Sequence, residues 1–118
     1  MKEEKFKVID FIRELIVYMD LHLQNFPRKE IALKPKLKME SYELLEIAYK
    51  ANITNEQKRI DLIEDMIAKV KVIDFLLNMC YDKQIINSKR YVKFGTKLDD
   101  IIKYASGWKK SLTIKTND

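Results

Sequence analysis

The chain has 118 residues, one cysteine and a formal net charge of +5. Hydrophobic residues make up 47% and charged residues 35%, a balance that excludes a disordered chain and a membrane-embedded one. With only two glycines and two prolines, the chain has too few turn residues for an all-β sandwich. We therefore expect an all-α protein, folded as a single domain of long helices with short links.

The first helix is expected over residues 5–25, because apolar residues recur there every three or four positions. They are Val8, Ile12, Leu15, Ile16, Met19, Leu23 and Phe26, with Phe11 and Tyr18 beside them. Pro27 disfavours helical geometry at the residue before it and ends the helix. Arg28 and Lys29 follow, either as phosphate contacts or, as the sequence alone favours, as an ordinary polar loop. His22 is the only histidine, which makes it a poor metal site.

Two further helices are expected over residues 34–51 and 55–82. Lys34, Lys36 and Lys38 crowd the start of the first of them, where cations oppose the helix dipole. This cluster is either a hint of an anionic partner or simply tolerated. The helix over 55–82 has an unusually broad apolar arc, which indicates either contact with another subunit or a central place in its own bundle. Cys80 lies on that arc, and we interpret it as a buried structural thiol.

The fourth helix is expected over residues 88–110, with a frayed tail at 111–118. Its apolar stripe consists of Tyr91, Phe94, Leu98, Ile101, Ile102, Ala105 and Trp108. Gly107 is expected to cap the helix in the left-handed conformation. The four helices and their short links favour an antiparallel up-down-up-down four-helix bundle.

A basic stripe runs beside this apolar one. Arg90, Lys93 and Lys97 are three and four residues apart and therefore share a flank of the helix. Asp100 is expected to pair with Lys97. Residues 84–118 contain eight basic and three acidic residues, so they hold the whole net charge of +5. A one-sided basic surface attracts polyanions such as nucleic acid, although a charge of this size also serves solubility.

Motifs that carry catalysis or bind metals do not occur in the sequence. There is no glycine-rich phosphate loop, no Cys-x-x-Cys pair and no Glu-x-x-His metal motif. Asp99 and Asp100 are adjacent, so they point about 100° apart and do not form a catalytic pair. We expect no enzymatic activity, no cofactor and no metal. The start of the chain lacks the apolar region of a signal peptide, and the lone cysteine suits a reducing compartment, so we expect a cytoplasmic protein.

Four short motifs, in this order and spacing, resemble the accessory variability determinant (Avd) family of four-helix-bundle proteins. They are NFPR at 25–28, ELLE at 43–46, VIDFLL at 72–77 and GWKKS at 107–111. Members of that family accompany the reverse transcriptases of diversity-generating retroelements. The family usually has a Leu-Gly pair where the second helix begins, whereas this chain has Leu33-Lys34-Pro35. A similar bundle occurs in proteins encoded by intervening sequences within large-subunit ribosomal RNA genes.

The resemblance implies a homopentamer that binds a reverse transcriptase and structured RNA, with DNA as a further candidate ligand, during error-prone cDNA synthesis. The leading hypothesis is a non-catalytic accessory protein with phosphate contacts at Arg90, Lys93 and Lys97. Weaker candidates for such contacts are Arg28, Lys29, Lys89, Lys109 and Lys110. The alternatives are an intervening-sequence bundle protein and a scaffold whose basic edge docks an acidic protein.

Overall fold

The computed structural model describes the backbone of residues 2–117 and the side chains of residues 7–113. The chain forms α1 (Lys2–His22), a short 3₁₀ helix η1 (Arg28–Glu30), α2 (Leu33–Ile53), α3 (Glu56–Asp82) and α4 (Ser88–Asn117). None of the described residues forms a strand. The expected all-α fold is therefore confirmed.

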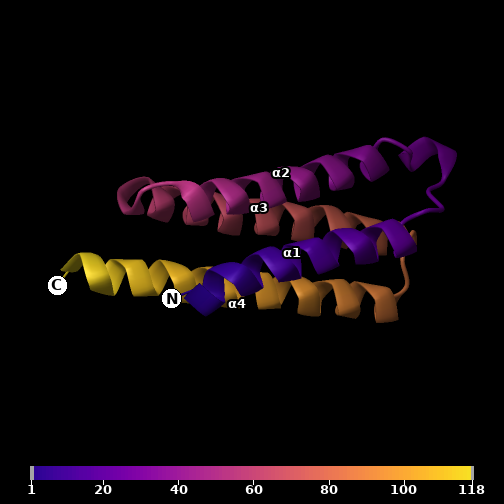
Figure 1. Ribbon diagram of the computed structural model, residues 1–118. Helices are drawn as coiled ribbons and strands as arrows, with labels where there is room; N and C mark the ends of the chain where they lie inside the picture. The colour runs from indigo at the N-terminus through magenta and orange to yellow at the C-terminus, as the bar shows by residue number, and fades with distance from the viewer. Residues whose placement is uncertain (1, 118) are drawn as a thin grey trace.

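The four α-helices pack in chain order around a shared core. α1 contacts α2 and α4, and α3 contacts the same two helices. Figure 1 shows neighbouring helices running in opposite directions, with both termini at one end and η1 at the other. The result is an elongated up-down-up-down bundle of 53 × 22 × 19 Å.

The predicted inner face of each helix is buried or half-buried, as expected from a period of 3.6 residues. Trp108 and Phe94 of α4 are the largest fully buried side chains, and α1, α2 and α3 add aliphatic residues and methionines to one continuous cluster. Phe26, just beyond α1, packs against the edge of this cluster. Cys80 is buried, and desolvation is the main cause that raises its thiol pKa to about 11. It is therefore protonated at neutral pH, as its structural interpretation requires.

The bounds of α1 and α4 differ most from the sequence prediction. α1 ends at His22 rather than at residue 25, and the side-chain amide of Gln24 donates to the Asp20 carbonyl at 3.2 Å. That amide takes the place of the backbone N–H that another turn of helix would have supplied. α1 also begins three residues earlier than expected, at Lys2.

α4 does not end at residue 110. It continues to Asn117, with Gly107 inside the helix and neither glycine at positive φ, so the predicted cap and the predicted frayed tail are wrong. The apolar period explains the extension, because Leu112 follows Trp108 by four residues and is buried in the core. Residue 118 lies outside the described residues.

The α2–α3 connection has a clamp that the sequence analysis missed. Arg59 donates from Nε to the Ala51 carbonyl at 2.7 Å and from Nη2 to the Thr54 carbonyl at 2.6 Å. These carbonyls lie at the end of α2, where the helix has no N–H groups left to satisfy them. Asn55 caps the start of α3, since its side chain accepts from the Lys58 N–H at 3.3 Å.

The lysines at the start of α2 have partners within the chain. Lys34 donates to the Gln24 carbonyl at 3.4 Å, Lys36 pairs with Glu40 at 2.9 Å, and Lys38 pairs with Asp20 of α1 at 3.0 Å. These contacts offset the unfavourable helix dipole. These lysines are therefore accounted for within the chain, and the cluster gives no indication of an anionic partner.

The broad apolar arc of α3 is likewise accounted for within one chain. All of its predicted members are buried or half-buried, because α3 packs against both α2 and α4. These members are Ile60, Leu62, Ile63, Met66, Ile67, Val70, Ile73, Leu76, Leu77 and Cys80. This favours the interpretation of α3 as central in its own bundle. Val72 and Phe75, which lie outside the predicted arc, remain 44% and 63% exposed.

An ion-pair network joins α2 to α3. Glu40 is buried, and its carboxylate lies 2.7 Å from Lys69 of α3 and 2.9 Å from Lys36, while Lys69 also lies 2.9 Å from Glu43. The hydrogen bonds that Lys36 and Lys69 donate to Glu40 hold the pKa of Glu40 below its ordinary value. The hydrogen bonds that Lys69 donates to Glu40 and Glu43 raise the pKa of Lys69. The carboxylate is therefore ionised at neutral pH despite its burial.

Replacing Glu40 with Gln is expected to lower the free energy of unfolding by about 1–3 kcal/mol at pH 7. Because the pKa of Glu40 is lower in the folded state, its contribution is complete above its unfolded pKa and is lost as pH falls through the folded pKa. Urea unfolding of both proteins from pH 7 to pH 3 measures this effect. The two stabilities should converge in acid, and a difference independent of pH would contradict the assignment.

Gly95 offers a stabilising change, because it lies inside α4 with no atom within 4 Å of where a Cβ would stand. Replacing Gly95 with Ala is expected to raise the free energy of unfolding by about 0.5–1 kcal/mol through the better helix propensity of alanine. Thermal unfolding followed by circular dichroism measures it. A lower melting temperature would show that the glycine is needed for packing.

Within residues 2–117, no helix combines the length and the apolar character needed to cross a membrane.

Candidate nucleic-acid interface

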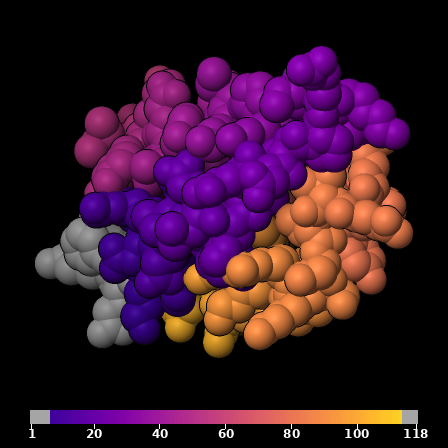
Figure 2. Space-filling view, turned by 90° about the vertical axis from the view of Figure 1, so that its right-hand side faces the viewer, coloured from indigo at the N-terminus to yellow at the C-terminus, as the bar shows by residue number. Residues whose placement is uncertain are grey.

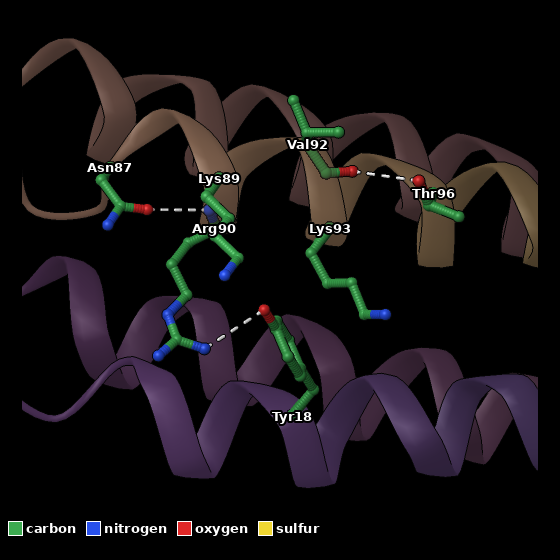
Figure 3. Close-up of a pocket in the computed structure, with 7 residues that line it drawn as sticks. All are labelled: Tyr18, Asn87, Lys89, Arg90, Val92, Lys93 and Thr96. Atoms are coloured by element: carbon green, nitrogen blue, oxygen red, sulfur yellow. Dashed lines mark hydrogen bonds between the residues drawn. The ribbon is translucent and has the colours of Figure 1, made fainter.

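The predicted basic stripe lies along the seam between α4 and α1. Figure 2 shows the surface of α1 and the residues after it (indigo to purple) adjoining that of the first half of α4 (orange). In Figure 3, Arg90 and Lys93 extend from α4 toward α1, and Tyr18 of α1 projects to meet Arg90. The helical spacing that puts Phe94 and Leu98 in the core thus puts Arg90, Lys93 and Lys97 beside α1.

Tyr18 organises this seam. Its ring packs edge-on against the buried ring of Phe94, with centroids 4.8 Å apart, which fixes it to the core. Arg90 donates from Nη1 to the Tyr18 hydroxyl at 3.4 Å, and its guanidinium carbon lies 6.0 Å from the ring centroid. The Lys97 ammonium lies 5.1 Å from the same centroid. One aromatic ring therefore holds two of the three predicted cations by cation–π attraction.

The cations surround a hollow in the surface. It has a volume of about 540 Å³ and is lined by Tyr18, Asn87, Lys89, Arg90, Val92, Lys93 and Thr96. A second hollow of about 420 Å³ also borders Tyr18 and is lined by Arg13, Glu14, Val17, Tyr18, Leu21 and Lys97. Lys89, a weaker candidate from sequence, thus joins the principal ones, and Tyr18 lines both hollows.

The cations of the seam lack carboxylate partners, in contrast to several lysines elsewhere in the bundle. Lys36, Lys38, Lys69, Lys83 and Lys109 each lie within 3.1 Å of a carboxylate oxygen. Across the described side chains, no ion pair involves the four cations of the seam, which are Lys89, Arg90, Lys93 and Lys97. The expected Lys97–Asp100 pair is therefore wrong, because Lys97 turns toward Tyr18 instead. Uncompensated positive charge is thus concentrated here.

The other sequence candidates lie elsewhere. Arg28 and Lys29 are exposed on η1. η1 lies at the same end of the bundle as the start of α4, and Glu30 of η1 pairs there with Lys83, which follows α3, at 3.1 Å. Lys109 faces α3, where it pairs with Glu64 at 2.8 Å. Lys110 is exposed, far along α4 from the hollow. The structure brings Lys89 to the principal three and leaves Lys109 on a different seam.

Sequence reasoning missed the role of Tyr18, which it assigned only to the edge of the core. In the sequence Tyr18 differs from Phe11, the other aromatic residue beside the apolar stripe of α1, only by its hydroxyl group. Its partner Arg90 is 72 residues away, so no local pattern could have paired them.

His22 reports the electrostatics of the seam. Its ring packs against Tyr18 with centroids 4.3 Å apart. Desolvation, followed by the nearby positive charge of Arg90, lowers the pKa of His22 from its ordinary 6.5, so the neutral form is favoured at pH 7.

Replacing Arg90 with Gln is expected to raise the pKa of His22 toward 6.5, since one of its two causes is removed. As His22 is the only histidine, the imidazole signals in a proton NMR titration report this group alone. Lys58→Gln, a change on α3, serves as the control and should leave the pKa unchanged. An unchanged His22 pKa in the Arg90 variant would mean that the guanidinium of Arg90 does not lie close to the imidazole ring.

Within the described residues, no group of three or more His, Cys, Asp or Glu side chains is arranged to hold a metal ion. The chemistry that the seam offers is attraction of anions by fixed cations beside an aromatic ring.

Comparison with known proteins adds one finding. No curated protein and no solved structure matches the chain significantly. The sequence pattern that defines the family described as bAvd-like matches residues 3–112, which span all four helices. The earlier resemblance is confirmed by this match, and the chain belongs to the bAvd-like family.

Proposed function

We propose that this protein is a non-catalytic accessory of a retroelement reverse transcriptase, which binds structured RNA, and DNA where it is presented, through the α1–α4 seam. The observation that supports the proposal is the group of four cations without carboxylate partners, Lys89, Arg90, Lys93 and Lys97, gathered around two adjoining hollows of one seam. Membership of the bAvd-like family supports the polymerase as partner.

The proposed mechanism is electrostatic. Each lysine or arginine that meets a phosphate displaces a condensed counterion, so affinity falls steeply as salt rises. Contacts to phosphates position the nucleic acid but read little of its sequence. The protein would hold folded RNA beside the polymerase without choosing individual bases.

Binding of a labelled RNA hairpin at several salt concentrations tests the nucleic-acid part of the proposal. The logarithm of the affinity should fall linearly with the logarithm of the salt concentration. An unrelated RNA should compete, since few base contacts are involved. The absence of RNA binding even at low salt would overturn this part.

Two experiments test whether the polymerase is a partner. Sequencing the DNA that flanks this gene should reveal a reverse transcriptase gene with paired template and variable repeats. When the two proteins are co-expressed, that polymerase should co-purify with this protein. Flanking ribosomal RNA genes would instead assign the chain to the intervening-sequence branch and remove the polymerase as partner.

The proposed assembly is a homopentamer, as the family relationship suggests. A native mass of five times 14.1 kDa, measured by light scattering at working concentration, is the expected result. A stable single-chain mass would contradict it.

A protein-docking scaffold is the second candidate, because Val17 and Leu21 are 59% and 61% exposed beside the cations of the seam. Apolar residues rimmed by charge are typical of protein interfaces. Competition separates the two candidates, since unrelated RNA should displace bound RNA but leave a docked protein largely in place.

A further inference from the structure

We propose that the hollow between the start of α4 and Tyr18 binds the 5′-polyphosphate of a ribonucleotide, carried either on an RNA end or on a free nucleoside triphosphate. The inference deepens the proposed nucleic-acid function, and its RNA arm rests on that function. It concerns one concave site within the seam, rather than general attraction along it.

The first argument is charge density. Lys89, Arg90 and Lys93 all line a single hollow, and none of its seven lining residues is acidic. A backbone phosphodiester carries one negative charge, and successive phosphates are spread along a strand. Three cations around one concavity match a ligand with several negative charges on adjacent phosphates better than they match a passing backbone.

The second argument is the set of donors. The guanidinium of Arg90 presents N–H groups in a planar fork that fits phosphate oxygens, and the ammonium groups of Lys89 and Lys93 add point charges. The Tyr18 hydroxyl accepts from Arg90 at 3.4 Å, which leaves its own proton to donate to a ligand. Asn87 accepts the Arg90 backbone N–H at 2.8 Å through Oδ1, so its amide group remains available to donate.

The third argument is shape. A volume of about 540 Å³ lies within the range of small-ligand pockets, whereas a flat basic face suffices to follow a backbone. The neighbouring hollow, which shares Tyr18, is more apolar, since Val17 and Leu21 line it. The phosphates would occupy the cationic hollow, and the nucleoside would lie against the Tyr18 ring toward that apolar side.

His22 provides a direct readout. Its pKa is held down in part by Arg90, and its ring touches Tyr18. A polyphosphate bound at Arg90 would offset that positive charge and raise the pKa of His22. No other histidine in the chain would confuse the measurement.

The experiment uses the full chain and four probes, which are inorganic tripolyphosphate, GTP, and one short RNA prepared with either a 5′-triphosphate or a 5′-hydroxyl. Tripolyphosphate is expected to raise the His22 pKa in an NMR titration. The 5′-triphosphate RNA should bind about tenfold or more tightly than its 5′-hydroxyl form by fluorescence anisotropy, from two or more added charge-assisted hydrogen bonds.

Two variants locate the effect. Lys89→Gln with Lys93→Gln should abolish the preference for the triphosphate end, because both residues line the cationic hollow. Lys97→Gln is the matched control, since Lys97 lines only the neighbouring hollow. This change should weaken the binding of both RNAs by a similar factor and leave the preference for the 5′-triphosphate end unchanged.

The outcomes separate this inference from the proposed function. Equal affinity for the two RNA ends, with an unchanged His22 pKa in tripolyphosphate, would overturn the inference and leave salt-dependent RNA binding intact. A raised His22 pKa with no binding of either RNA would support the site and overturn the RNA function. Competition by GTP against the 5′-triphosphate RNA at comparable concentration would identify the free nucleotide as a sufficient ligand, and its absence would identify the RNA end.

Discussion

Replacing Arg90, Lys93 and Lys97 together with glutamate is expected to lower the affinity for an RNA hairpin by a factor of about a hundred or more near 0.1 M salt. Each lost phosphate contact removes about one unit from the slope of log affinity against log salt, so the slope should become shallower by roughly 2–3. The three new carboxylates add repulsion of their own. Anisotropy titrations at several salt concentrations give both quantities.

A charge-matched control makes this result specific to the seam. Lys50, Lys58 and Lys71 lie exposed on α2 and α3, and their replacement with glutamate changes the net charge by the same amount. That variant should lose far less affinity, and circular dichroism should show both triple variants folded. Equal losses in the two variants would mean that net charge, rather than the seam, governs binding.

Replacing Trp108 with Ala is expected to lower the free energy of unfolding by about 3–5 kcal/mol. The side chain is 1% exposed and is one of the two largest in the core, so its removal leaves a cavity that rigid helices fill only in part. A loss of that size is a large share of the stability of an ordinary domain, about 5–15 kcal/mol. Because the variant lacks the only tryptophan, unfolding in urea should be followed by circular dichroism.

Trp108→Phe is the control for volume, and it should cost clearly less than the alanine change because much of the cavity stays filled. This comparison also tests the extended end of α4, since Trp108 and Leu112 are both buried beyond the middle of that helix. A cost below about 1 kcal/mol for Trp108→Ala would show that this end of the bundle is not packed as described. A tryptophan exposed in that way could stack on a base of the nucleic acid.

Much of the fold was predictable because it depends on local periodicity. The apolar residues of each helix recur with the helical period, so their burial followed from the sequence alone. Asn55 was recognisable as a cap for the same reason, since its partner Lys58 is three residues away. The end of α4 was mispredicted because residues 111–118 are mostly polar, whereas Leu112 continues the apolar period and is buried.

The candidate site was predictable only in part. The spacing of Arg90, Lys93 and Lys97 put them on one flank, and the structure keeps them there. Lys109 belonged to the same charge-rich segment, yet it pairs with Glu64 of α3. The helical period shows that Lys109 lies on a different side of α4 from Arg90, Lys93 and Lys97. Whether a lysine on either side meets a carboxylate depends on the helix that packs there.

The sequence by itself determined which residues share a face of each helix, because that depends on the 3.6-residue period within one segment. The tertiary structure alone decided which faces meet. It placed Glu40 beside Lys69 and Asp20 beside Lys38, which neutralises those lysines, and it placed Tyr18 rather than a carboxylate beside Arg90. Ion pairs between helices act over a few ångströms, and residues distant in the chain reach that range only when the bundle packs. The charge that remains unpaired on the α1–α4 seam is therefore a property of the packed bundle.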